Sequence, residues 1–184
     1  MIVVNTLFPL ALSESQEYDG YMSDCSVANT FFCKYSLFGG LTNEQLDIVR
    51  PYINEHTHKK GEHILVQGEF NSRVYFIVEG IVSIEKYPEH HEKMSRKIVT
   101  LQAGDSFGEM ELIDIQPCAA SAIALSDSLM VSLDNSDFYL LSKSHLKIYT
   151  MMMLNLARDI SRRLRKTDEL LAEAVMKSKD TYIL

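Results

Sequence analysis

The sequence predicts a mainly β domain, a sandwich or barrel, with one helix before it and two helices after it. Between about residue 53 and residue 133, short apolar runs are separated by regularly placed glycines. Many short strands at near-regular spacing are typical of sandwiches and barrels. From about residue 144 to residue 177, apolar residues recur every three or four positions, which indicates a long helix. The length of 184 residues suits one such domain with short extensions.

The predicted domain begins with a short helix. Residues 1–36 have no periodic pattern, so we expect them to form a loosely structured extension. Thr42 and Gln45 have the spacing of a capping box, and Leu46 and Val49 follow at helical spacing. Pro51 is expected to end this helix.

The β pattern is clearest around a predicted hairpin. Apolar residues at 74–78 and 81–84 flank Glu79 and Gly80, as two strands flank a tight turn. Residues 98–101 and 128–133 are predicted to be further strands. After Asp134 the pattern becomes helical, with Asn135 or Ser136 as the expected cap of a short helix that reaches Leu141. The chain is therefore divided into residues 1–36, 37–134 and 135–184.

The long predicted helix carries a nearly straight apolar stripe. Its later members are spaced as in a coiled-coil seam, namely Ile160, Leu164, Thr167, Leu171 and Ala174. The first half of the helix has a domain to pack on, whereas little chain remains to cover the second half. An uncovered apolar stripe favours a partner helix. We therefore predict a homodimer formed along this helix, and another protein partner is an alternative.

Charge and cysteine content restrict the function further. The formal net charge of −7 argues against a protein that coats phosphate backbones. Three cysteines without close spacing indicate reduced thiols and a cytoplasmic protein. The apolar N-terminus has no basic residue before Lys34 and is too short to span a bilayer. We therefore expect no signal peptide, no membrane segment and no DNA binding.

Three glycine-containing segments, 61–69, 74–80 and 104–109, resemble cyclic-nucleotide-binding domains of the catabolite activator and protein kinase A regulatory type. The resemblance extends from about residue 37 to residue 174. It implies a double-stranded β-helix (jelly roll) followed by a short helix and a long C-terminal helix. It also implies a non-enzymatic, regulatory role in signal transduction. Only residues 175–184 follow the stripe of the long helix, so we expect no helix-turn-helix, and the chain resembles a sensor without a DNA-reading part.

The resemblance identifies a phosphate-binding cassette. Gly108 lets backbone approach a ligand closely, and the resemblance implies that Glu109 accepts from a ribose hydroxyl. The family normally has alanine two positions after this glutamate and arginine nine positions after it; here the residues are Glu111 and Cys118. The predicted ligand-binding residues are Phe107, Gly108, Glu109, Met110, Glu111, Cys118, Ala119, Ala120, Ser121 and, on the long helix, Thr167 at an adenine-contacting position.

These two replacements predict weak or lost binding of cyclic AMP and cyclic GMP. A hydrogen bond to a charged group contributes about 1.5–3 kcal/mol, and Cys118 cannot supply it. Two like charges 4 Å apart repel by about 1–4 kcal/mol, so Glu111 adds to the loss if it faces the phosphate. If Glu111 points to solvent, only the first loss applies. A working cyclic-nucleotide or other small-ligand sensor is therefore the alternative function.

A cupin-like metal enzyme is a less favoured alternative. His56, His58 and Glu62 resemble part of a cupin metal motif, but no second histidine motif follows. We expect both histidines to face solvent on an edge strand, and we predict neither a metal site nor catalytic residues. The basic run on the long helix is expected to be a solvated face; it consists of Arg158, Arg162, Arg163, Arg165 and Lys166.

Overall fold

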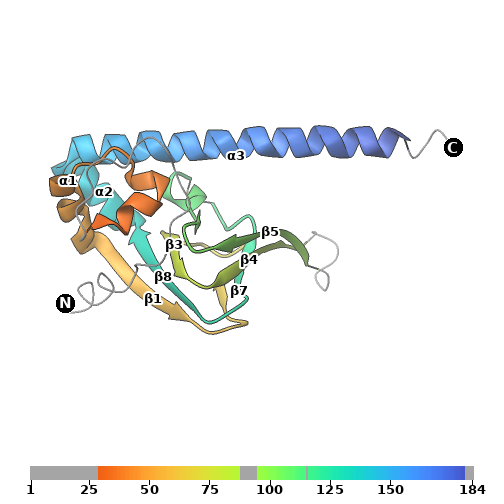
Figure 1. The fold of residues 1–184 in the computed structure, drawn as a ribbon, viewed down its shortest axis with the longest axis horizontal. Helices are drawn as coiled ribbons and strands as arrows, with labels where there is room; N and C mark the ends of the chain where they lie inside the picture. Colours follow the sequence, from red (N-terminus) through yellow and green to blue (C-terminus); the bar gives the residue numbers. More distant parts are fainter. Residues whose placement is uncertain (1–28, 88–94, 115, 181–184) are drawn as a thin grey trace.

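The computed structural model describes residues 29–87, 95–114 and 116–180, without the side chains of Glu111 and residues 177–180. Its strands form two antiparallel four-stranded sheets that face each other, and its helices lie against one of them (Figure 1). The predicted fold class is therefore confirmed. The expected extension of residues 1–36 lies mostly outside the described residues.

The chain enters through short helical turns. Two 3₁₀ turns, η2 (Phe32–Lys34) and η3 (Ser36–Phe38), precede helix α1 (Asn43–Val49). The predicted capping box is present, because Thr42 Oγ1 accepts from the Gln45 amide while the Gln45 side chain accepts from the Thr42 amide. A third turn, η4 (Arg50–Tyr52), contains Pro51 and leads into the first strand.

The strands of the described residues are divided equally between the two sheets. The first sheet has the order β1 (Ile53–His58), β8 (Ser128–Asp134), β3 (Arg73–Glu79) and β6 (Ser106–Phe107). The second sheet has the order β2 (His63–Leu65), β7 (Ser121–Ala124), β4 (Ile81–Lys86) and β5 (Arg96–Gln102). Strands β3 and β4 flank Gly80, as predicted, and Gly80 has the positive φ of 102° that a tight turn requires.

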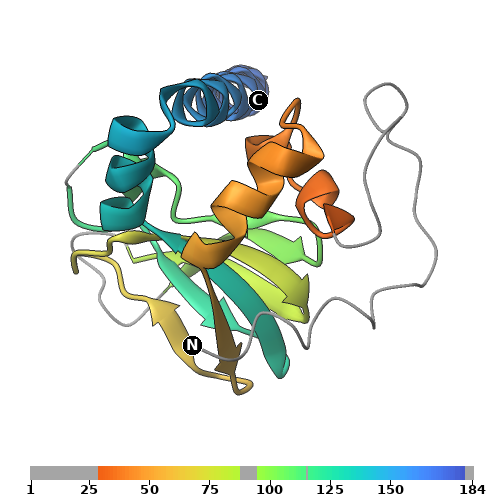
Figure 2. The ribbon, with the colours of Figure 1, turned by 90° about the vertical axis from the view of Figure 1, so that its left-hand side faces the viewer.

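Two apolar cores hold the molecule together. One fills the space between the sheets and includes Ile77, Val82, Phe107, Cys118 and Met130. The other lies between the first sheet and the helices, and its members alternate along the strands with those of the first core. Figure 2 shows the helices gathered over this face of the sheet.

Helix α2 (Asn135–Ser144) follows β8 directly. Its N-cap is Asp134, so the expected cap at Asn135 or Ser136 is wrong. The Asp134 carboxylate is used elsewhere, because Ser72 Oγ donates to it over 2.9 Å and Arg73 Nε over 2.9 Å. The side chain thus ties the start of β3 to the end of β8.

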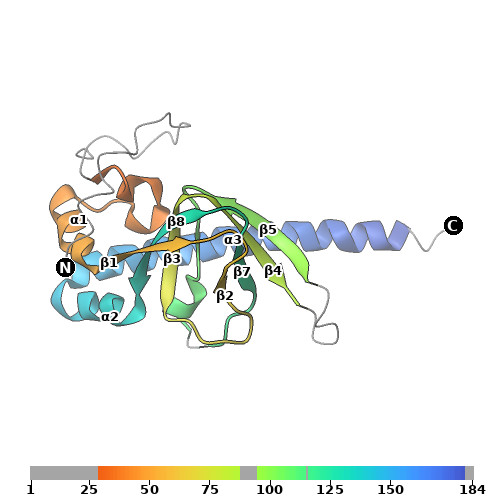
Figure 3. The same ribbon diagram turned by 90° about the horizontal axis from the view of Figure 1, so that it is seen from below.

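Helix α3 (Leu146–Asp180) has two different halves. In the first, Ile148, Met152 and Leu156 are buried, and Asn155 Nδ2 donates to the carbonyls of Leu37 (3.2 Å) and Gly39 (2.7 Å). The second half continues past the sheets (Figures 1 and 3). None of the helices in the described ranges has both the length and the apolar character needed to cross a bilayer.

The cysteines differ from expectation. Cys33 is disulfide-bonded, so the prediction that all three cysteines are reduced is wrong for Cys33. The cysteine content therefore no longer supports a cytoplasmic location. Cys118 is buried. Cys25 lies outside the described residues.

Candidate functional site

The cassette begins at a tightly restricted turn. Phe107 pairs with Tyr75 across β6 and β3, and the two rings stack with centroids 5.3 Å apart. Gly108 follows with φ of 78°, and a Cβ there would lie 2.6 Å from the Arg73 carbonyl oxygen. The Asn71 side chain fixes that neighbour by bonding both the amide and the carbonyl of Arg73. Only glycine fits this turn without strain.

Glu109 is held by the long helix. Its side chain is 8% exposed, and Arg163 Nη1 of α3 donates to its carboxylate. Arg163 Nη2 donates to the Ser106 carbonyl over 3.0 Å. Arg163 is 51% exposed, as expected for the basic run, but its guanidinium also binds the cassette, which was not expected. Sequence reasoning missed this contact, although Arg163 lies one helical turn before Thr167 and so on the same face.

The residues that follow Glu109 in the cassette expose one apolar side chain and bury another. Glu109 leads into the 3₁₀ turn η5 (Met110–Leu112), where Met110 is 59% exposed and Leu112 is buried. The side chain of Glu111 is outside the described part of the structure, so its expected orientation is not tested. With three residues, η5 is too short to provide the anion site of a helix N-terminus.

Cys118 is built into the core between the sheets. It is 3% exposed, its amide donates to the Glu69 carbonyl over 2.8 Å, and its carbonyl accepts from the Gly68 amide over 2.9 Å. The thiol thus occupies the place of a small apolar side chain. Ala119 is exposed and Ala120 is half-buried. Ser121 is buried, and its hydroxyl accepts from the Gln67 amide over 2.9 Å, which is a structural role.

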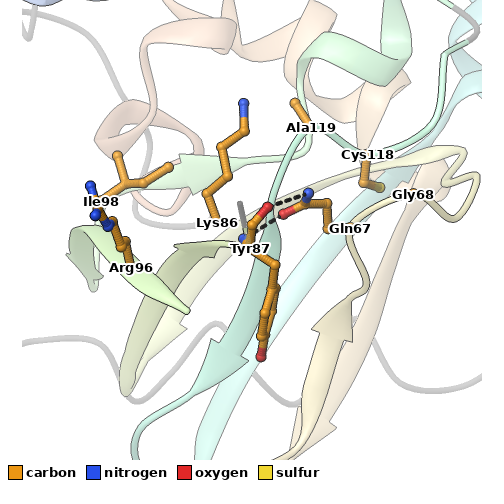
Figure 4. Close-up of a pocket in the computed structure, with 8 residues that line it drawn as sticks. All are labelled: Gln67, Gly68, Lys86, Tyr87, Arg96, Ile98, Cys118 and Ala119. Atoms are coloured by element: carbon orange, nitrogen blue, oxygen red, sulfur yellow. Dashed lines mark hydrogen bonds between the residues drawn. The ribbon is translucent and has the colours of Figure 1, made fainter. Parts of the chain in front are cut away.

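A pocket of about 660 Å³ opens beside Cys118 and Ala119 (Figure 4). Gln67 forms part of its wall by bonding the Tyr87 backbone twice, as acceptor over 2.8 Å and as donor over 3.0 Å. The remaining lining residues are Gly68 on the loop, Lys86 on β4, and Arg96 and Ile98 on β5. Sequence reasoning did not identify this wall, because it depends on which strands become neighbours.

Thr167 is not part of this pocket. It is exposed on α3, and its hydroxyl donates to the Arg163 carbonyl over 2.9 Å. The structure therefore brings Phe107, Gly108 and Glu109 to one side of the cassette and Cys118 and Ala119 to the pocket. The Thr167 hydroxyl forms its hydrogen bond within its own helix.

His56 and His58 face inward, so the expectation that they face solvent is wrong. His56 Nε2 lies 2.8 Å from Ser132 Oγ, His58 Nδ1 lies 2.9 Å from a Glu62 oxygen, and both rings meet the edge of Tyr75. Burial lowers the pKa of His56, and the charges of Arg73 and His58 lower it further. Within the described residues, no three histidine, cysteine or acidic side chains are grouped to hold a metal ion.

Comparison with known proteins gives the family. The sequence model of the cyclic nucleotide-binding domain family matches residues 55–145. The cyclic AMP receptor protein of Thermus thermophilus is 30% identical over 132 residues, which are 72% of this chain and 58% of that protein. The chain thus spans less than two thirds of this relative.

Solved structures agree with that match. The catabolite activator protein of Thermus thermophilus has a TM-score of 0.67 at 28% identity, over 76% of this chain and 63% of that chain. A mutant regulatory subunit of a cyclic-AMP-independent protein kinase A from Trypanosoma brucei, with cyclic AMP bound in its A site, has a TM-score of 0.56. It is 19% identical over 65% of this chain and 41% of that chain, which shows the fold alone. Through residues 55–145, the chain belongs to the cyclic nucleotide-binding domain family.

Proposed function

We propose that this chain is a non-enzymatic regulatory module whose pocket binds cyclic AMP and cyclic GMP weakly or not at all. The observation that carries the proposal is the environment of Cys118. Its side chain is buried in the core between the sheets, and both its backbone groups are bonded to residues 68 and 69. A buried cysteine side chain at this position offers no positive charge to a cyclic phosphate.

The loss is large compared with the affinity of an ordinary site. Micromolar binding corresponds to about −8 kcal/mol. An arginine–phosphate pair is among the strong hydrogen-bonded contacts, and its absence removes about 1.5–3 kcal/mol. The expected weakening is therefore about 10- to 100-fold before any repulsion from Glu111 is added.

Titration calorimetry with cyclic AMP and cyclic GMP tests the proposal. Dissociation constants of about 10–100 μM are expected from the loss of one charged contact, and weaker ones if Glu111 adds repulsion. Submicromolar binding by the unmodified chain, with the cyclic phosphate in the cassette, would show that the reasoning from Cys118 is wrong.

A double substitution, Cys118→Arg with Glu111→Ala, is expected to increase cyclic AMP affinity at least about tenfold. The pocket beside Cys118 gives the longer side chain a volume of about 660 Å³ to enter. The Trypanosoma brucei mutant carries the same kind of change, with alanine replacing a glutamate and arginine replacing a threonine seven positions later. Cys118→Ala with Glu111→Ala is the matched control, because it removes the same groups without adding a guanidinium. A folded Arg variant that binds no better than this control would place the loss elsewhere in the pocket.

The same proposal includes a dimer formed by residues 135–184. Leu164, Leu170 and Leu171 are 60%, 58% and 62% exposed on the second half of α3. Burial of apolar surface contributes about 25 cal/mol per Å², so pairing this face with a second copy is favourable. The basic residues beside it, Arg162 and Arg165, repel their copies in a parallel pair, which makes the dimer moderate in strength and sensitive to salt.

We further propose that the module does not bind DNA specifically. Its net charge is −7, and basic residues of the described helix are partly used within the chain: Arg163 binds Glu109 and Arg162 binds Asp159. A mobility shift that survives physiological salt and competitor DNA would contradict this.

A further inference from the structure

The wall of the pocket opposite Cys118 is positively charged. Lys86 at the end of β4 and Arg96 at the start of β5 are direct cross-strand partners, so both project from the same face of the sheet. The lining residues given above include these two cations and no acidic residue. Figure 4 shows Lys86 extending toward the segment of Ala119, and Arg96 beside Ile98.

This pair of cations is not neutralised by the described part of the protein. Neither side chain forms an ion pair with any residue of the described ranges. Like charges directly opposite each other on neighbouring strands are destabilising. The next rung of the same hairpin is different, because Lys97 is opposite Glu85. Hydrogen bonds from Ser95 and Ser83 are the main causes that lower the pKa of that carboxyl, and the charge of Lys97 lowers it further. Among the described residues, the charges without an ion-pair partner are therefore on the pocket side, where an anion between them would stabilise both.

We propose that this pocket binds a phosphate monoester, with its phosphate between Lys86 and Arg96 and its organic part toward Cys118 and Ala119. A monoester carries a charge of about −1.5 to −2 at pH 7, which matches two cations. A cyclic phosphodiester carries a single negative charge and matches them less well. The pocket volume of about 660 Å³ lies within the range of about 300–1,000 Å³ usual for small-molecule sites. This inference rests on the proposed function, because it places the ligand in the same pocket.

Titration calorimetry with adenosine 5′-monophosphate, cyclic AMP and adenosine tests this assignment. The monophosphate is expected to bind at least about tenfold more tightly than cyclic AMP, because it makes one more charged contact. In the double variant Lys86→Gln, Arg96→Gln, the affinity for the monophosphate should fall about 10- to 100-fold, while the affinity for adenosine stays the same. Both side chains are exposed, so the fold should be preserved, and circular dichroism verifies this.

Lys97→Gln is the matched control, since it removes a neighbouring cation of β5 that faces Glu85 instead of the pocket. It should leave the binding of the monophosphate unchanged. Equal or tighter binding of cyclic AMP, or a double variant that keeps the monophosphate affinity of the unmodified chain, overturns the inference. The two proposals fail separately: tight cyclic AMP binding by the unmodified chain contradicts the proposed function. Monophosphate binding that does not depend on Lys86 and Arg96 contradicts only the present inference.

Discussion

The contact between Arg163 and Glu109 connects the long helix to the cassette, and its strength can be measured. Replacing Arg163 by glutamine removes the guanidinium that donates both to the Glu109 carboxylate and to the Ser106 carbonyl. Glu109 is almost fully enclosed, so its carboxylate would lose a charged partner without gaining full access to water. We therefore expect Arg163→Gln to destabilise the folded state.

The magnitude follows from the burial of the two partners. Breaking a fully buried ion pair costs about 3–5 kcal/mol, but the Arg163 side chain is 51% exposed. The relevant range is therefore that of hydrogen bonds to charged groups, about 1.5–3 kcal/mol. Arg162→Gln is the matched control, because Arg162 is the next residue and bonds Asp159 over 2.6 Å on the same exposed helix. Such a surface pair contributes about 0.3–0.5 kcal/mol.

Urea denaturation of Arg163→Gln, Glu109→Gln and the double variant completes a double-mutant cycle. A coupling energy of at least about 1 kcal/mol is expected for residues in direct contact. The double variant should be less destabilised than the sum of the single variants, because it no longer buries a charge. An Arg163→Gln variant as stable as Arg162→Gln, or a coupling energy near zero, would refute the assigned contact.

Three further predictions concern the turn, the inward histidine and the helix. Gly108→Ala should lower the free energy of unfolding by about 2–5 kcal/mol through backbone strain and collision with Arg73. Gly104→Ala, with positive φ but nothing within 4 Å, should lose only about 1–2 kcal/mol in the same urea titration. Because burial, Arg73 and His58 lower the pKa of His56 against the opposing effect of Asp134, its protonation favours the unfolded chain. The free energy of unfolding should therefore fall as pH drops below about 6.5; His56→Gln should flatten this decline, whereas the exposed His63→Gln should not. Leu164→Asp should give a folded monomer in light scattering where the unmodified chain is a dimer at tens of micromolar; a monomeric unmodified chain would contradict the dimer.

The sequence predicts the elements of this fold well because their signals are local. The capping box at Thr42 and Gln45 depends on residues three positions apart, and both of its hydrogen bonds are present. The turn at Gly80 depends on one residue with positive φ. The cassette is also a local motif, so Gly108, Glu109 and Cys118 could be identified without knowing which strands are neighbours.

The pocket wall and the histidines depend on information that is not local. Lys86 and Arg96 become partners only through the register between β4 and β5, across a connection of nine residues. His56 and His58 alternate with Glu55 and Thr57, so the sequence alone allows either set to face inward. His56 is directly opposite Met130, which belongs to the core between the sheets, and this register turns both histidines inward.

The contact between Arg163 and Glu109 joins the long helix to the cassette. The family resemblance implies that a ligand hydroxyl donates to Glu109. Such a hydroxyl would share the carboxylate with Arg163, and ligand binding would then be linked to the position of α3 at residue 163. Beyond that residue the exposed side chains of Leu164 and Leu171 offer a surface for a second copy. Linkage is reciprocal: a partner that changes ligand affinity by a given factor has its own affinity changed by the same factor when the ligand binds. Because Arg163 is the residue through which this linkage would act, Arg163→Gln should reduce the effect of ligand on dimerisation more than it reduces dimerisation itself. Sedimentation of the unmodified chain and of Arg163→Gln, each with and without adenosine 5′-monophosphate, measures dimerisation and its dependence on the ligand separately.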